Sequence, residues 1–212
     1  MTERPEMLNE RKKTSPLAVV LSTVLTVLLL LAIAFFVFRF WFNTHYFVVE
    51  VDGSSMEYTM QNGDSLYAKK GSTAKRGDVV IIDVSDYHGE YSFSGTLIIK
   101  RLIATEGDSV RIRDGGVEIK YADAQDYIRL EEPYVHAATD PKPTESSQSE
   151  WSVGEGEIFF LGDNREVSQD SRYVGCLSRK KIVGVVPDWA IKHKTSAKTG
   201  NTNTNDSVRI KT

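Results

Sequence analysis

The pattern of apolar and polar positions begins with one long apolar run near the N-terminus. Residues 17–38 comprise 22 positions without a single charge. At about 1.5 Å per residue, a helix of this length spans roughly 33 Å, close to the hydrocarbon thickness of a bilayer. Arg39, Trp41 and Phe42 follow, as residues at a membrane interface commonly do. A core helix would need a polar face, and only three hydroxyl residues interrupt the run, so we predict a transmembrane helix over residues 17–42.

The charges that flank this run predict its orientation. Four cations precede it, Arg4, Arg11, Lys12 and Lys13, whereas no Lys or Arg lies between Asn43 and Met60. The positive-inside rule therefore places residues 1–16 in the cytoplasm and the remainder outside. Ala32 and Ala34 form an Ala-Ile-Ala motif that is compatible with a cleaved signal peptide, but the apolar stretch exceeds a typical h-region and continues beyond Ala34. We therefore expect an uncleaved signal anchor.

Beyond the anchor the apolar runs become short, β-branched or aromatic, and bounded by turn residues. They cover residues 45–51, 65–70, 78–84, 95–104, 157–163 and 181–189. Residues 108–121 alternate around Asp114-Gly115-Gly116, which is a strong hairpin signal. Strands at this spacing, with almost no helical periodicity, indicate a mainly β, barrel-like domain over residues 43–191.

Two polar segments are expected to lie outside this sheet structure. Residues 138–150 are rich in Pro and Ser, which indicates a loop or mobile insertion. Residues 192–212 offer little apolar surface to bury, so we predict a disordered tail.

Composition excludes several classes of protein. The 212 residues fit one domain with appendages, and a net charge of -3 gives no basic character that would indicate nucleic acid binding. The one cysteine, Cys176, excludes an internal disulfide framework and a Cys-rich metal site. The four histidines are scattered without a zinc-binding spacing. We therefore expect neither metal nor other cofactor.

The stretch VDGSSMEYTM raises the question of a serine nucleophile at Ser54 or Ser55. A serine hydroxyl reacts poorly until a neighbour accepts its proton, and histidine is the usual acceptor. The histidines here lie in polar or terminal settings that are typical of solvated surface residues. A turn or helix cap is the simpler interpretation of the serine pair taken alone.

Lysine can replace histidine as the base if it is uncharged near neutral pH. This requires desolvation, because the ordinary pKa of lysine is about 10.4. Lys100 lies inside the apolar stretch TLIIKRLIA, where a strand would place it on one face with Ile98 and Leu102. These neighbours make Lys100 a candidate base, although a single lysine in a strand is more often an edge or snorkelling residue.

A third candidate region, residues 161–175, follows the apolar strand end FFLG with a dense cluster of polar residues. Asp170 and Arg172 are suited to an ion pair that braces this loop. Ser168 is suited to a hydrogen bond with a buried amine. By composition alone, a polar surface loop is the simpler interpretation.

In order and spacing, these segments resemble the type I signal peptidases, which are membrane-anchored Ser/Lys endopeptidases. The family's first motif, Gly-x-Ser-Met-x-Pro-Thr, is matched by residues 53–59, and the second, an Arg-Gly-Asp run entering a strand, by residues 76–80. The third motif, Lys-Arg followed by Gly-Asp, is matched at 100–101 and 107–108. The fourth, Gly-Asp-Asn-x-x-x-Ser-x-Asp-Ser-Arg, is matched at every fixed position over residues 162–172. The similarity extends from the anchor to about residue 189.

The resemblance implies the identity of the reacting groups. The nucleophile would be Ser55, the serine directly before Met56, rather than Ser54, and the base would be Lys100. The backbone N–H of Ser55 would contribute to the oxyanion hole. Some members carry a further serine hydroxyl two positions before the nucleophile, and Gly53 at that position lacks this donor.

The resemblance also implies the supporting residues and exposes two departures. Ser168 would hold the lysine amine, and Asp170 with Arg172 would fix their loop. Tyr58 stands where the family has proline, and residues 104–108 lack the proline of the family's Gly-x-Pro-Gly-Asp pattern. We expect both departures to affect turns near the site rather than to remove a reacting group.

The function implied by the resemblance is that of a membrane-bound serine endopeptidase. It would cleave N-terminal signal peptides from exported preproteins after small residues, through an acyl-enzyme. Its partners would be these preproteins and the lipid bilayer, with the secretion translocon as a further candidate. The protein would cross the cell membrane once, and by analogy an extended substrate would pair with the chain near Val51–Gly53 and Ile82–Val84.

Three alternatives stay open. A catalytically weak or inactive relative would act as a membrane-tethered binding or assembly module, and Tyr58 is the residue that encourages this interpretation. A self-cleaving Ser/Lys domain of the kind found in stress-response repressors would carry a DNA-binding helical domain rather than an anchor. A sortase-like transpeptidase would use Cys176, but no Thr-x-Thr-Cys-like motif surrounds that residue.

Overall fold

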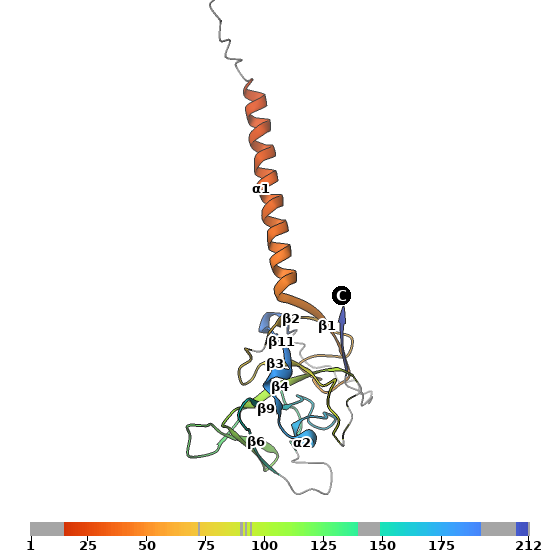
Figure 1. Ribbon diagram of the computed structural model, residues 1–212, viewed down its shortest axis with the longest axis vertical. Helices are drawn as coiled ribbons and strands as arrows, with labels where there is room; N and C mark the ends of the chain where they lie inside the picture. Colours follow the sequence, from red (N-terminus) through yellow and green to blue (C-terminus); the bar gives the residue numbers. More distant parts are fainter. Residues whose placement is uncertain are drawn as a thin grey trace, which may run out of the picture. The chain divides into compact units, whose positions relative to one another are not determined.

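The computed structural model describes residues 15–71, 73–89, 91, 93, 95–139, 149–191 and 207–211 (Figure 1). The chain separates into two compact units, Met1–Thr44 and His45–Thr212. The cations at positions 4 and 11–13, on which the expected orientation depends, lie outside the described residues.

The first unit consists largely of the helix α1, Pro16–His45, none of whose residues is buried. Its length and apolar composition are sufficient to cross a membrane. The hydroxyl groups of Thr23 and Thr26 donate to the backbone carbonyls of Val19 and Ser22, one turn earlier. Because these donors are satisfied within the helix, they add little cost to burial in a hydrocarbon layer.

The second unit is built on an eight-stranded antiparallel sheet with the order β10-β9-β4-β3-β11-β2-β1-β12. Its strands are β1 (Tyr46–Asp52), β2 (Ser65–Lys70), β3 (Val79–Asp83), β4 (Leu97–Thr105), β9 (Glu157–Leu161), β10 (Leu177–Ser178), β11 (Ile182–Val186) and β12 (Ser207–Lys211). The last strand in this order, β12, also lies beside β4 near its middle, so the sheet is curled. The predicted mainly β, barrel-like fold is therefore confirmed.

A smaller sheet with the order β7-β6-β5-β8 packs beside the larger one. It comprises β5 (Ser109–Arg113), β6 (Gly116–Lys120), β7 (Ile128–Arg129) and β8 (Glu150–Ser152). The short helices are α2 (Ser171–Val174), η1 (Arg179–Lys181) and η2 (Asp188–Ala190). The predicted hairpin is confirmed, because β5 and β6 join through Asp114 and Gly115, both with positive φ.

Every predicted apolar run contains a strand, whereas the shortest strands were not predicted. β7, β8 and β10 have only two or three residues each, too few to show an alternating pattern. Most of the loop expected at 138–150 lies outside the described residues, although Glu150 already begins β8.

The tail differs in part from the predicted disorder. Residues 192–206 and 212 lie outside the described residues, but Ser207–Lys211 form β12 against β1. Val208 and Ile210 alternate with polar residues in SVRIK, and β1 offers a sheet edge with which this segment pairs.

The core is packed against both faces of the large sheet. In β4, Leu97 and Ile99 belong to the same apolar cluster as Met56, whereas Ile98 and Leu102 belong to a second cluster. This alternation follows from the two-residue period of a strand. Because both faces are covered, a polar side chain near the middle of β4 is removed from water.

Candidate active site

Ser55 lies in the turn that follows β1. Gly53 leaves the strand with a φ of 120°, a conformation that favours glycine, and its N–H donates to Asn62 Oδ1 at 3.0 Å. Met60 N then donates to Met56 O at 2.8 Å, which closes a helical turn just after the serine. Met56 is 1% exposed and packs in the core. The buried methionine therefore fixes the turn that presents Ser55.

Lys100 approaches Ser55 from the middle of β4. Its side chain is fully buried, and its neighbours Ile98 and Leu102 are fully buried as well. Lys100 Nζ lies 2.5 Å from Ser55 Oγ, within hydrogen-bonding distance. The structure thus brings together two residues that are 45 positions apart in the sequence.

Ser168 comes from the loop after β9 and lies against the same turn. A Cβ atom added at Gly162 would fall 2.2 Å from Ser168 Oγ and 2.6 Å from the Ser55 carbonyl oxygen. Ser168 Oγ is buried and has no hydrogen-bond partner in the described part of the chain. The bond to the Lys100 amine that the resemblance implies is therefore not formed here, although the hydroxyl lies in this region of the site. A buried hydroxyl without a hydrogen-bond partner is uncommon, because it lowers the stability of the folded state.

Asp170 and Arg172 brace the Ser168 loop, as their sequence pattern suggested. Arg172 Nε donates to Asp170 Oδ1 at 2.9 Å, and the other carboxylate oxygen accepts from Gly162 N at 3.1 Å. Arg172 also donates to the Arg165 carbonyl at 2.7 Å. Burial alone would favour the neutral acid, but the charge and hydrogen bonds of Arg172 outweigh it and lower the pKa of Asp170.

A second buried ion pair, which the sequence patterns did not reveal, links three segments of the site. Arg101 binds Asp163 through two hydrogen bonds of 2.8 and 2.6 Å, and its guanidinium lies 3.8 Å from the centre of the Tyr134 ring. Asp163 also accepts from Thr59 Oγ1 at 2.5 Å. The pair therefore connects β4, the end of β9 and the Ser55 turn. Two signals in the sequence were available: Arg101 directly follows Lys100, and the carboxylate of Asp163 comes soon after the buried strand β9.

Asn164 makes a further link that sequence analysis did not assign. Its backbone N–H donates to the Ser55 carbonyl at 2.9 Å. The loop after β9 therefore holds the nucleophile turn through the main chain, so this contact does not depend on side-chain identity.

Tyr58, the first departure from the family pattern, has a φ of 80°. Proline cannot adopt this conformation, because its ring fixes φ near about -65°. The tyrosine ring stacks on His136 with the ring centres 4.0 Å apart. The turn after Ser55 therefore has a geometry that the family's proline would not permit.

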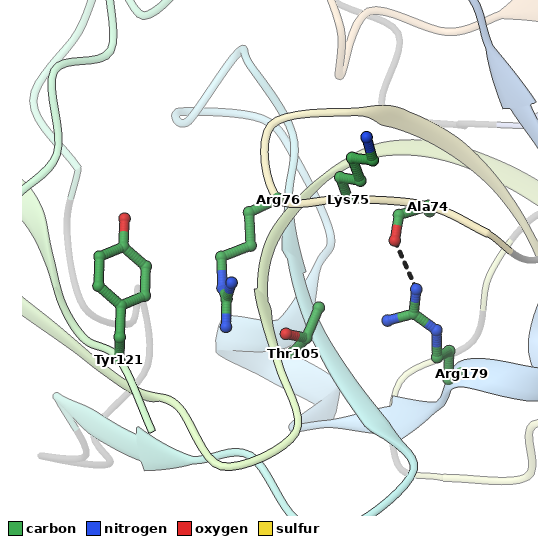
Figure 2. Close-up of a pocket in the computed structure, with 6 residues that line it drawn as sticks. All are labelled: Ala74, Lys75, Arg76, Thr105, Tyr121 and Arg179. Atoms are coloured by element: carbon green, nitrogen blue, oxygen red, sulfur yellow. Dashed lines mark hydrogen bonds between the residues drawn. The ribbon is translucent and has the colours of Figure 1, made fainter. Parts of the chain in front are cut away.

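The second departure lies beside a polar pocket of about 500 Å³ that neither Ser55 nor Lys100 lines. Its lining consists of Ala74, Lys75, Arg76, Thr105, Tyr121 and Arg179 (Figure 2). Arg76 binds both carboxylate oxygens of the buried Asp108, at 2.6 and 2.7 Å, and Asp108 accepts from Thr105 N at 2.9 Å. Asp108 thus holds the turn of residues 104–108 in the absence of the proline.

The other candidate nucleophile and bases have unfavourable surroundings. Burial, with a smaller contribution from Glu157, raises the pKa of Cys176 to about 11, which disfavours the reactive thiolate. His88 and His136 are exposed, and His193 lies outside the described residues. Among the described residues, no group of three or more His, Cys, Asp or Glu side chains is arranged to hold a metal ion.

Comparison with known proteins adds independent information. The family described as "Signal peptidase, peptidase S26" matches residues 20–189. Signal peptidase I of Bacillus licheniformis is 28% identical over 189 residues, covering 84% of this chain and 91% of the relative. The Bacillus subtilis (strain 168) protein named "Signal peptidase I V" is 29% identical, covering 71% of this chain and 97% of the relative. A crystal structure of a signal peptidase I from Enterococcus faecalis V583 is 27% identical, with a TM-score of 0.41, and covers 54% of this chain and 97% of that chain.

Proposed function

Because the chain belongs to the signal peptidase family, peptidase S26, we propose that it cleaves signal peptides from exported preproteins with Ser55 as the nucleophile and Lys100 as the general base. The observation that carries this proposal is the 2.5 Å contact between Lys100 Nζ and Ser55 Oγ in a buried setting. Burial disfavours the charged form of an amine, and only the uncharged amine can accept the serine proton.

The proposed reaction proceeds in two steps. Ser55 Oγ attacks the scissile carbonyl while Lys100 takes its proton, and the resulting ammonium protonates the leaving amine. This forms an ester-linked acyl-enzyme. Lys100 then takes a proton from a water molecule as the water oxygen attacks the ester carbonyl. The resulting ammonium gives this proton to Ser55 Oγ as the ester bond breaks and the cleaved peptide is released as a carboxylic acid. Backbone N–H groups, including that of Ser55, would stabilise the oxyanion, since Gly53 supplies no hydroxyl donor.

The supporting residues have roles that follow from their contacts. Ser168 Oγ, buried without a partner among the described residues, would bind the Lys100 amine when a substrate tightens the site. Asp170 and Arg172 would hold the Ser168 loop through their ion pair. Met56 would fix the position of Ser55, because its own side chain is buried in the core.

The membrane arrangement is proposed from the sequence together with α1. A single span over residues 17–42 would leave residues 1–16 in the cytoplasm and the peptidase domain, residues 43–191, outside the cell membrane. Substrates would be exported preproteins with signal peptides, presented at the bilayer and in some cases by the secretion translocon. Protease treatment of intact spheroplasts tests this: we expect the domain to be degraded and a tag at the N-terminus to be protected.

The direct test uses the full chain in detergent with a preprotein substrate. We expect Ser55→Ala and Lys100→Met to abolish cleavage without a change in thermal unfolding, since both substitutions nearly preserve buried volume. Ser54→Ala is the matched control, because it removes the adjacent hydroxyl and should retain cleavage. If Ser55→Ala and Lys100→Met both still cleave, the dyad is rejected. If the unmodified chain binds the preprotein but does not cleave it, the tethered binding module is the better account.

A further inference from the structure

The C-terminal strand β12 occupies the outer edge of β1, the strand that leads into Ser55. The two strands are antiparallel and pair from Val48 with Lys211 to Asp52 with Ser207. Asp52 lies three residues before Ser55, so the paired edge ends within about 10 Å of chain from the proposed nucleophile. Figure 1 shows β12 beside β1, ending at the C-terminus.

The strand that carries Lys100, β4, is a second neighbour of β12. Its pairing with β3 covers residues 97–101, and its pairing with β9 begins only at Arg101. β12 lies beside β4 as well as β1. It therefore runs between the strand that leads to Ser55 and the strand that bears Lys100.

The site expected for an extended substrate changes accordingly. Of the segment Ile82–Val84, Ile82 already pairs with Ile98 on one side and with Ile182 on the other. The other expected segment, Val51–Gly53, overlaps the edge of β1, and in this structure β12 takes that edge. An outward-facing row of N–H and C=O groups can pair with one strand at a time.

We propose that β12 is an intramolecular competitor of the substrate, which must leave the edge of β1 before a signal peptide can pair there. This inference rests on the proposed peptidase function of Ser55 and Lys100. In this proposal the edge of β1 is occupied by residues 207–211 of the same chain, which pair with it through main-chain hydrogen bonds.

The connection to the domain makes docking and release both feasible. Residues 191–206 separate η2 from β12, and 16 residues can span up to about 55 Å. Such a tether gives the strand an effective concentration in the millimolar range, on the order expected for short linkers. A strand of five residues paired along its length with β1 is short enough to be displaced by a substrate. If β12 is paired with β1 in nine-tenths of the molecules, KM is about tenfold higher than for a chain without β12, while kcat is the same.

The test compares membrane-anchored chains in detergent micelles, and the substrate is a peptide that spans a preprotein cleavage site. One variant ends after residue 206, and its matched control ends after Lys211 and so loses Thr212 alone. A V208P/R209P variant removes two consecutive amide N–H groups, one of which must face β1 because they alternate. R209Q/K211Q keeps the backbone donors and removes the charges.

We expect the truncation and the double-proline variant to lower KM by about three- to tenfold at unchanged kcat, with hydrogen exchange faster at Val48–Asp52. The two controls should match the unmodified chain. Equal KM values across all variants, or cleavage of the chain itself just before Ser207, would overturn the inference.

Binding separates this inference from the proposed function. In a Ser55→Ala background the uncleaved peptide should bind more tightly to the truncated chain by the same factor. If no chain cleaves but this difference in affinity persists, the peptidase proposal fails and the competition stands. If cleavage is normal and affinity is unchanged by truncation, only the competition fails.

Discussion

Gly162 lies against both Ser168 and the backbone of the Ser55 turn. Its missing Cβ would lie 2.2 Å from Ser168 Oγ and 2.6 Å from a backbone oxygen, so neither a rotamer change nor a small shift of one side chain makes room. A side chain here must therefore move the nucleophile turn itself.

This leads to a prediction for Gly162→Ala. We expect kcat/KM to fall by about 10²-fold, because a displacement of about 1 Å in the reacting groups has this order of effect. Peptide cleavage and thermal unfolding should be measured together. Gly154→Ala is the control, since its added methyl meets only the flexible Glu157 side chain. Unchanged activity of Gly162→Ala would show that the turn tolerates displacement.

Tyr58 makes a second prediction at the residue scale, because its left-handed conformation excludes the proline that relatives carry. Tyr58→Pro restores the family motif in sequence but requires a change in φ from 80° to about -65°. We therefore expect it to lower kcat/KM, whereas Tyr58→Gly should retain most activity and relieve about 1 kcal/mol of backbone strain. Higher activity of Tyr58→Pro in the peptide assay would contradict this account of the turn.

At the scale of elements, α2 and its N-cap Asp170 hold the loop that carries Ser168. Asp170 accepts from Arg172 N and Nε, and its second carboxylate oxygen accepts from Gly162 N. The loop is thereby tied both to its own helix and to the end of β9. The carboxyl group of Asp170 stabilises the fold through these contacts only while it is ionised.

The pH dependence of stability follows from the lowered pKa of Asp170. A carboxyl group with a depressed pKa stabilises the folded state above its ordinary value, about 3.9, and this contribution disappears as the pH falls through the folded pKa. Asp170→Asn should therefore lower Tm at pH 5–8 by a nearly constant amount, and the difference from the unmodified chain should shrink below about pH 4. Thermal unfolding followed by circular dichroism across this range measures it. A difference that persists undiminished at low pH would mean that packing, rather than charge, is lost.

Across the whole molecule, the sequence predicted features that depend on local patterns of apolar and polar residues. It did not predict contacts between residues that lie far apart in the chain. The apolar runs identified the strands because alternation is local, and the burial of Lys100 followed from its apolar neighbours in β4. The Arg101–Asp163 pair was not predicted, because 62 positions separate its members and the local motifs that contain them do not show that these two side chains meet. Likewise, β12 depends on an edge formed by β1, which no property of SVRIK alone reveals.

The division into two units carries the last prediction, which concerns the anchor. None of the residues of α1 is buried, and the β-rich unit begins at His45 with its own core. A chain that begins at His45 should therefore fold and cleave a short soluble peptide with nearly unchanged kcat/KM. Against a preprotein inserted in vesicles it should be slower by about 10²-fold, because tethering both molecules to one bilayer raises their effective concentration.

The control for this experiment replaces α1 with an unrelated apolar helix of equal length. This chain should recover the rate on vesicles, since the argument needs only a common membrane and no specific contact of the helix. Equal rates for the anchored and the shortened chains on the inserted preprotein would contradict it, and would mean that the β-rich unit reaches its substrate without the span.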